Sequence, residues 1–274
     1  MPKTLTPPET LPSDRGKPFV ASVEKCFQVL KAFRTGQTDL HLRDLGLSEI
    51  TRLSGLDKSA AQRFSETLVT LGYLDKDPQT RRYRPAIKLI EFYYTFMVSN
   101  RLAQIAMPHL IEAGKIYDTT VNLCELSGND IIYTVRIPHE KASYGTTLAG
   151  RRIPAFCTAP GTVMLANMPD DDAEKIFATS NIRPITEYTL TDLDDLRAQR
   201  KQARLNGYHV NNQQSQLHNF STAAPIVALD GRAVGAVHIP THPPHWTLAT
   251  VNAKIVPLAI KTARLISDSL TDAL

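Results

Sequence analysis

Residues 47–84, LSEITRLSGLDKSAAQRFSETLVTLGYLDKDPQTRRYR, carry the clearest structural pattern in the chain. Apolar residues repeat at three- and four-residue spacing in 47–54 and again in 58–71, which predicts two short amphipathic helices. Gly55 follows the first helix and easily adopts the left-handed conformation that ends helices, while Asp57 is a good N-cap for the second. Two short helices joined by a glycine-containing turn are typical of a helix-turn-helix.

A basic hairpin follows the second of these helices. Tyr73-Leu74 is expected to form a strand, and Arg81–Arg84 the returning strand. Between them, Asp77-Pro78-Gln79-Thr80 has proline at the position where it presets a turn. The whole segment therefore predicts a winged helix-turn-helix.

The charge of the chain is concentrated in this region. The net charge is +4; residues 1–100 carry 15 basic and 11 acidic side chains, whereas residues 101–274 carry 16 of each. Between Lys58 and Lys88, seven basic residues stand against three acidic ones. Such an asymmetry indicates a surface that binds a polyanion, although a solvated helix face with a basic loop would have the same charge.

DNA accounts for each part of this pattern. The helix after the turn fits the major groove, where Gln62 can pair with adenine and Arg63 with guanine. Lys58 and Ser59 suit a phosphate or a base edge, and the wing arginines suit phosphates or the minor groove. The alternative is a small helical unit whose basic hairpin binds protein. The predicted DNA-binding residues are Lys58, Ser59, Gln62, Arg63, Arg81, Arg82 and Arg84.

The segments on either side of residues 19–84 extend this domain. Residues 1–18 are polar and proline-rich without the apolar core of a signal peptide, so we expect a flexible tail. Ser22 to Phe33 is predicted as a helix with Ser22 as its N-cap. Residues 85–100, starting at Pro85, are apolar on almost all sides and predict a linker helix. Such a helix would be buried in a dimer contact or, alternatively, against its own domain.

Residues 101–274 mix helices with hairpins and predict an α+β domain with an antiparallel sheet. Turn signals at 127–130 and 230–231 each separate two apolar runs of strand length. The expected strands are 119–126, 131–137, 208–211, 223–229 and 233–239, and the expected helices are 107–117, 158–167, 170–178, 191–207 and 248–269.

Several classes of protein are disfavoured by the sequence. No apolar run is long enough to cross a membrane, and three scattered cysteines fit a reduced, cytoplasmic location without disulfides. His238, His242 and His245 are interrupted by prolines and have no nearby carboxylate, so we expect no metal site. No nucleophile elbow, phosphate-binding glycine loop or carboxylate pair indicates catalysis, and we expect neither an enzyme nor a cofactor. An enzyme that processes its ligand, or a sensor acting through protein partners, remain the alternatives.

The motifs SVEKCFQVL (22–30), SEITRLSGLDKSAAQRF (48–64), TLVTLGYL (67–74) and RRYR (81–84) resemble the IclR family of bacterial regulators. In the second half, RPITEYTLTDLDDLRAQRKQARLNGYHV (183–210) and AAPIVALDGRAVGAVHI (223–239) are similar to the GAF-like effector domain of that family, so the resemblance covers about residues 20–270. GRRIPAFCTAPGTVMLA (150–166) resembles the branch that controls aromatic-acid catabolism, such as protocatechuate and 4-hydroxybenzoate regulators.

The resemblance implies a homodimer or tetramer that binds a double-stranded DNA operator and responds to a small aromatic carboxylate, such as terephthalate, protocatechuate or 4-hydroxybenzoate. A non-aromatic organic acid is the alternative effector. This chain departs from the family around the expected pocket: Thr162 stands in place of a basic residue, uncharged 211–214 in place of acids, and His238 in place of a serine or similar residue. The residues that the resemblance places at the effector are Arg136, Arg152, Thr158, Ala159, Asn211, Ser221 and His238.

Overall fold

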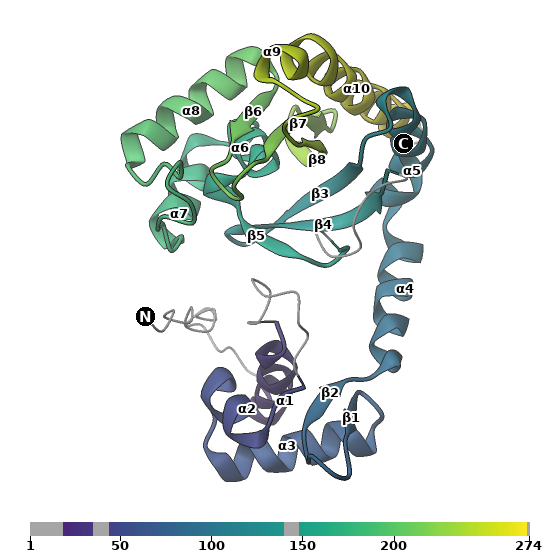
Figure 1. The fold of residues 1–274 in the computed structure, drawn as a ribbon, viewed down its shortest axis with the longest axis vertical. Coiled ribbons are helices and arrows are strands. Elements are labelled where there is room, and N and C mark those ends of the chain that lie inside the picture. The colour runs from purple at the N-terminus through teal and green to yellow at the C-terminus, as the bar shows by residue number, and fades with distance from the viewer. Residues whose placement is uncertain (1–18, 35–43, 140–147, 273–274) are drawn as a thin grey trace. The chain divides into compact units, whose positions relative to one another are not determined.

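The computed structural model describes residues 19–34, 44–139 and 148–272, and the chain divides into two compact units, Met1–Met97 and Val98–Leu274 (Figure 1). The predicted tail, 1–18, lies outside the described residues. No helix among the described residues is both long and apolar enough to cross a membrane.

The first unit contains the predicted helix-turn-helix and wing. Its helices are α1 (Ala21–Ala32), α2 (Leu47–Ser54) and α3 (Lys58–Thr70), and its strands are β1 (Leu74–Lys76) and β2 (Tyr83–Pro85). Helices α1, α2 and α3 pack against one another because each buries one apolar stripe. The core formed in this way contains Val29, Ile50, Ala61, Leu68, Leu74 and Tyr83.

The turn between α2 and α3 has the predicted local chemistry. Gly55 ends α2 with a φ of 71°, the left-handed region in which glycine is least strained. The Asp57 carboxylate accepts a hydrogen bond from the Ala60 amide at 2.9 Å, so Asp57 is the N-cap of α3 as predicted. The prediction for Ser22 is wrong, because α1 begins at Ala21 after Val20 and Ser22 lies inside its first turn.

The wing is a two-stranded antiparallel hairpin whose strands are shifted from the predicted ones. Leu74 pairs with Pro85 and Lys76 with Tyr83. Asp77 begins the predicted turn, and its carboxylate accepts hydrogen bonds from the amides of Gln79 and Thr80 at 2.8 and 2.7 Å. The prediction that Pro85 starts a helix is wrong: it is the last residue of β2, since an edge strand tolerates a residue without an N–H.

The predicted linker helix begins later than expected and is more exposed. A single turn of 3-10 helix, η1 (Ile87–Leu89), precedes α4 (Ile90–Ser99). No residue of α4 is buried, and Ile90, Phe92 and Tyr94 have exposed fractions of 63%, 59% and 70%. Among the described residues, this helix contacts its own domain through pairs such as the rings of Tyr73 and Phe92, whose centroids lie 5.6 Å apart.

The second unit is built on a six-stranded antiparallel sheet with the order β5-β4-β3-β8-β7-β6. Its strands are β3 (Val121–Ser127), β4 (Asp130–Ile137), β5 (Arg152–Pro154), β6 (His209–Asn212), β7 (Phe220–Val227) and β8 (Ala233–Thr241). Both predicted hairpins, β3–β4 and β7–β8, are present, and they meet through the pairing of β3 with β8. The α+β prediction with an antiparallel sheet is confirmed.

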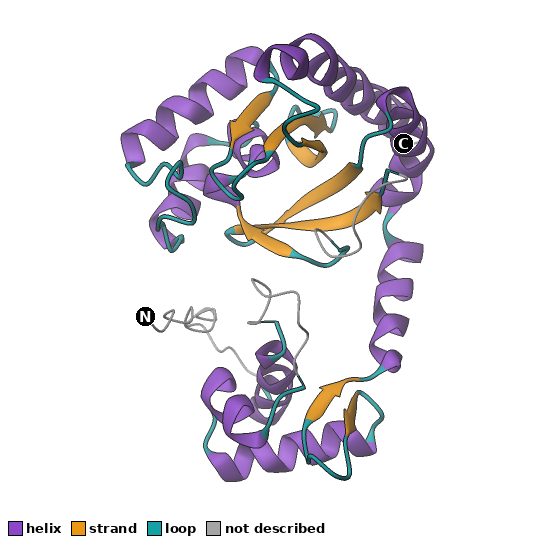
Figure 2. Ribbon diagram, viewed as in Figure 1, coloured by secondary structure: helices purple, strands orange, loops and turns teal. Residues whose placement is uncertain are grey.

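Helices pack against both faces of this sheet (Figure 2). The long helices α5 (Arg101–Tyr117) and α10 (Val256–Asp272) contact one face, and the fully buried α6 (Ala159–Ala166) contacts the other. Around them lie η2 (Ala155–Cys157), α7 (Asp170–Thr179), α8 (Leu193–Asn206), α9 (Leu248–Thr250) and η3 (Val251–Ile255).

Three features of this unit differ from the sequence prediction. Helix α5 begins at Arg101, capped by Asn100, and includes Pro108 in its interior, whereas the prediction started at Met107. Strand β5 was not predicted, because its three residues are too few to give a periodic signal. The single predicted C-terminal helix contains the π-helical turn η3, which separates α9 from α10.

Candidate DNA-binding surface and effector site

Four of the predicted DNA-binding residues lie on one exposed face of α3. Lys58, Ser59, Gln62 and Arg63 are all exposed, while Ala60, Ala61 and Leu68 on the opposite side of the helix are buried in the core. Because residues three and four apart share a helix face, the polar side chains near the start of α3 point away from the domain together. This arrangement leaves them available to the edges of bases.

The three wing arginines have different surroundings. Arg81 is exposed at the wing, and Arg84 pairs with Asp75 across the hairpin at 3.3 Å. Arg82 instead binds Glu49 of α2 at 2.5 Å and donates to the Asp44 carbonyl at 2.7 Å. A hydrogen bond from the Gly46 amide, together with Arg82, lowers the pKa of Glu49. Arg82 therefore holds the wing to α2, a role that sequence reasoning did not assign to it.

Glu66 fixes the wing to α3 from the other side. Its carboxylate accepts hydrogen bonds from Lys76 of β1 and from the Tyr83 hydroxyl of β2, the latter at 2.7 Å. The hydrogen bonds from Lys76 and Tyr83 lower the pKa of Glu66. Since Tyr83 is also buried in the core, the wing and the predicted reading helix form one rigid surface.

In the second unit, a buried hydrogen-bonded chain crosses the sheet on the side of α6. The Ser221 hydroxyl lies 2.8 Å from Nε2 of His238, and the Asn122 amide nitrogen lies 3.0 Å from Nδ1. The Tyr133 ring packs edge-on against the imidazole, with centroids 5.5 Å apart. The side chains of β3, β4, β7 and β8 thus converge on His238.

The imidazole of His238 is neutral. Burial, with a smaller contribution from the nearby Arg136 guanidinium, lowers the pKa of His238 to about 3. A neutral imidazole has one donor and one acceptor nitrogen. The tautomer therefore determines whether the Ser221 hydroxyl donates to the ring or accepts from it. If the hydroxyl donates to the ring, it can only accept from a ligand; if it accepts from the ring, it can donate to a ligand.

The start of α6 lies beside this chain. The Asn211 amide donates to the Cys157 carbonyl at 3.0 Å, and Asn211 pairs with Ser221 in the sheet. The Thr158 hydroxyl accepts the Gly161 amide at 3.2 Å and caps α6, with Ala159 buried behind it. Five predicted effector residues are thereby brought together: Thr158, Ala159, Asn211, Ser221 and His238.

The two arginines predicted at the effector lie in different parts of the sheet. Arg136 faces the cluster, because it pairs with Asn122, which pairs in turn with His238 on the next strand. Arg152 binds Asp130 at 3.1 Å and the Ser127 carbonyl at 2.7 Å, at the turn that joins β3 to β4. Its sheet partner, Ile132, is four residues from Arg136 along β4, or about 13 Å. The structure thus places Arg152 outside the cluster.

Asn122 is a residue of this cluster that sequence reasoning missed. It is completely buried, and its amide oxygen has no hydrogen-bond partner among the described residues. The opposite orientation of the amide would satisfy the oxygen on His238 and leave the nitrogen free, so one end is available either way. An uncompensated buried amide is costly, so this end of the Asn122 side chain is available to a polar group of a ligand or to a water molecule. The only signal in the sequence is one polar residue between Val121 and Leu123 in an apolar strand.

Arg136 supplies the charge of the site. Its side chain is half-buried, and within the described ranges no carboxylate pairs with it. Burial lowers the pKa of Arg136, but a guanidinium remains a cation at neutral pH. A partly desolvated cation without a counterion favours an anionic ligand.

A winged helix-turn-helix joined to a separate α+β unit with a buried polar cluster defines the class of DNA-binding transcriptional regulators with an effector domain. Two family models match the chain: the IclR helix-turn-helix domain at residues 22–78 and the bacterial transcriptional regulator IclR C-terminal domain at residues 95–268. The chain belongs to the IclR family, whose members are transcriptional regulators and not enzymes.

Individual relatives agree with this assignment. The chain is 26% identical over 265 residues to the Pca regulon regulatory protein of Pseudomonas putida, covering 96% of this chain and 89% of that protein. An IclR transcriptional regulator from Alicyclobacillus acidocaldarius shares the fold with a TM-score of 0.78 at 20% identity, over 92% of this chain and 99% of that one. An IclR homolog from Microbacterium hydrocarbonoxydans, complexed with 4-hydroxybenzoate, has a TM-score of 0.72 at 21% identity, over 91% and 98%.

Proposed function

We propose that this regulator controls an aromatic catabolic operon and responds to a small aromatic carboxylate bound at the His238 cluster. The observation that supports this proposal most directly is the position of Arg136 beside the unsatisfied amide of Asn122. The Arg136 guanidinium is half-buried and has no carboxylate partner among the described residues. Together they offer a charge-assisted donor and a hydrogen-bonding partner to a carboxylate. The adjacent Tyr133 ring offers an apolar surface to an aromatic ring. Terephthalate, protocatechuate and 4-hydroxybenzoate share this chemistry.

The names of two relatives support the aromatic class. One relative is the Pca regulon regulatory protein of Pseudomonas putida, and another, 22% identical over 240 residues, is the p-hydroxybenzoate hydroxylase transcriptional activator of Acinetobacter baylyi. A protein of the same fold is complexed with 4-hydroxybenzoate. The neutral residues Asn211–Gln214, in place of acids, would not repel an anion from the same site.

The effector prediction is tested at Arg136. We expect Arg136→Gln to weaken binding of the aromatic carboxylate about 10- to 100-fold, because it removes a charge-assisted hydrogen bond worth about 1.5–3 kcal/mol. A thermal-shift titration measures this, since a ligand bound to the folded state raises stability by mass action. Arg264→Gln, an exposed arginine of α10, is the matched control.

Two outcomes of this titration count against the proposal. If non-aromatic acids raise the melting temperature and no aromatic carboxylate does, the aromatic class is wrong. If Arg136→Gln binds the effector as tightly as the unaltered protein and Arg264→Gln, the ligand occupies another site.

For the DNA side, we propose that Gln62 and Arg63 read base edges, and that Lys58, Ser59, Arg81 and Arg84 contact the backbone or the groove edges. Arg82 acts through the position of the wing. We further propose a homodimer, because Ile87, Ile90 and Tyr94 would otherwise leave a large apolar surface in water. Two wings related by a twofold axis match a palindromic operator. Effector binding then favours one of two arrangements of the DNA-binding domains.

The reading role is tested with Arg63→Ala. The probe is a duplex that the protein selects from a random-sequence pool, compared with a scrambled duplex of the same length and composition. We expect the variant to bind the selected duplex about 10- to 100-fold more weakly and the scrambled duplex nearly unchanged, as a lost bidentate base contact requires. Unaltered discrimination between the two duplexes would remove Arg63 from the set of base readers.

A further inference from the structure

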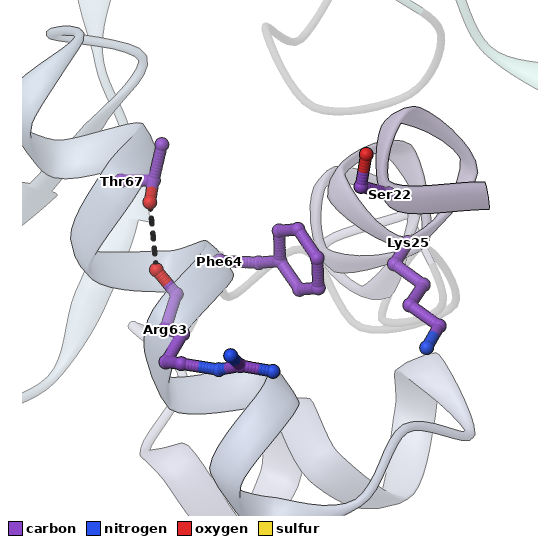
Figure 3. A pocket seen from close by; sticks show the side chains of 5 residues that line it. All are labelled: Ser22, Lys25, Arg63, Phe64 and Thr67. Carbon is purple, nitrogen blue, oxygen red and sulfur yellow. Dashed lines mark hydrogen bonds between the residues drawn. The ribbon is translucent and has the colours of Figure 1, made fainter. Parts of the chain in front are cut away.

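A hollow lies between α1 and α3, next to the exposed face of α3. It has a volume of about 430 Å³ and is lined by Ser22 and Lys25 of α1 and by Arg63, Phe64 and Thr67 of α3 (Figure 3). The Phe64 ring points from α3 toward α1, and the side chains of Lys25 and Arg63 extend on the same side of that ring. A water molecule occupies about 30 Å³ in the liquid, so the hollow accommodates a phosphate group together with water.

The hollow is basic and uncompensated. None of its five lining residues is acidic, and neither Lys25 nor Arg63 forms an ion pair with any carboxylate in the described part of the chain. This differs from Lys76, Arg82 and Arg84 on the wing, each of which has a carboxylate partner. Since Arg63 is assigned to a base edge, Lys25 is the cation of the hollow that stays available to an anion, and a charge-assisted hydrogen bond from its ammonium suits a phosphate oxygen.

The position of the hollow beside α3 points to a phosphate of DNA as the anion. Arg63 lies on the face of α3 that would enter the major groove, and Lys25 projects from the neighbouring helix. The phosphates of DNA border that groove, so a cation beside a reading helix faces the backbone instead of the bases. Thr67 already donates its hydroxyl to the Arg63 carbonyl at 2.9 Å, whereas the exposed Ser22 hydroxyl forms no hydrogen bond within the described residues.

We propose that this hollow binds one phosphate of the DNA backbone, with Lys25 as its cationic ligand and Ser22 as a second donor. The proposal rests on the DNA-binding surface proposed above and adds α1 to it. Lys25 was absent from the residues that the sequence pointed to, because it lies more than thirty residues before α3 in the chain. Its contribution is independent of base sequence, unlike that of Arg63.

The test measures affinity against salt concentration with the full-length protein and the two duplexes described for Arg63. Each lost phosphate contact lowers the slope of log K against log salt by about 0.9. We expect Lys25→Gln to reduce the slope by this amount for each protomer on the duplex. It should also weaken binding to the selected duplex and to the scrambled duplex by the same factor. Lys25→Arg should restore the slope. Lys261→Gln, an exposed lysine of α10, is the matched control for loss of one charge.

Each outcome is decisive for the proposal. A slope for Lys25→Gln equal to that of Lys261→Gln and the unaltered protein would overturn the phosphate site while leaving the DNA-binding surface of α3 intact. Failure of the unaltered protein to prefer any duplex would instead contradict the proposed function. Inorganic phosphate without DNA, at constant ionic strength, should leave the melting temperature unchanged. A shift that depends on Lys25, together with a salt slope that Lys25→Gln leaves unchanged, would mean that the hollow binds free phosphate and not the DNA backbone, and would overturn the proposal.

Discussion

Replacing Gly161 with alanine is expected to destabilise the second unit by about 3 kcal/mol or more. Gly161 lies in the buried helix α6, and a Cβ at this position would lie 2.1 Å from the carbonyl oxygen of Ala155 and 2.5 Å from its Cα. These atoms belong to the backbone and cannot rotate away, so η2 and α6 would have to separate. The gain in helix propensity, at most about 1 kcal/mol, does not offset this. Denaturant unfolding followed by the fluorescence of Trp246, the single tryptophan of the chain, reports on this unit.

A second helical glycine provides the control. A Cβ on Gly114 of α5 would meet its nearest atom, the Thr119 carbonyl oxygen, at 3.4 Å, an ordinary contact. Gly114→Ala should therefore leave stability within about 1 kcal/mol of the unaltered protein, in either direction. Equal effects of the two substitutions would contradict the close approach of α6 to η2. The effect bears on function because Thr158 and Ala159, which belong to the proposed effector site, depend on the same approach.

The DNA-binding unit could be predicted from the sequence because its determinants are local. The left-handed position of Gly55, the cap at Asp57 and the apolar period of α3 all act within a few residues, and each is present in the structure. Pro85 was assigned wrongly because proline is tolerated both in the first turn of a helix and in an edge strand. The choice between them depends on the pairing of β2 with β1, which the proline itself does not encode.

The cluster around His238 could be predicted only in part because it depends on the order of strands. Asn122 and His238 are 116 positions apart in the chain, and they meet only because β3 pairs with β8. Arg136 and Arg152 are equivalent in sequence terms, since both are basic residues next to apolar runs. Asp130 and Ser127 bind Arg152 at the hairpin turn, and no comparable partner is described for Arg136. Only the burial of each arginine and its contacts in the folded sheet therefore show that Arg136 faces the His238 cluster and that Arg152 does not.

Acid is expected to destabilise the second unit well before its carboxylates are protonated. Burial lowers the pKa of His209 to about 4, and burial together with Arg136 lowers the pKa of His238 to about 3. In the unfolded chain both would titrate near 6.5. Below that pH the unfolded state binds more protons than the folded one, so stability is fully present above about pH 7 and falls as the pH is lowered. At pH 5 each histidine costs about 2 kcal/mol by this linkage, and the two together about 4 kcal/mol.

The carboxylates with lowered pKa values, such as Glu66 and Glu174, respond in a different window. Their stabilising contribution is present above their unfolded pKa, near 4.3, and is lost only as the pH falls further. The loss between pH 7.5 and pH 5 therefore isolates the buried histidines.

The measurement is the free energy of unfolding from Trp246 fluorescence at half-unit steps between pH 7.5 and 5. His238→Asn changes the stability at every pH, but it should also halve the slope with pH, because one of the two titrating groups is gone. His245→Gln, which removes an exposed histidine, should leave the slope unchanged. A slope that is flat in the unaltered protein, or unaffected by His238→Asn, would mean that His238 accepts a proton in the folded state. In that case the cluster would already carry positive charge near neutral pH, and the neutral imidazole that the structure places beside Ser221 would be wrong for the proposed effector site.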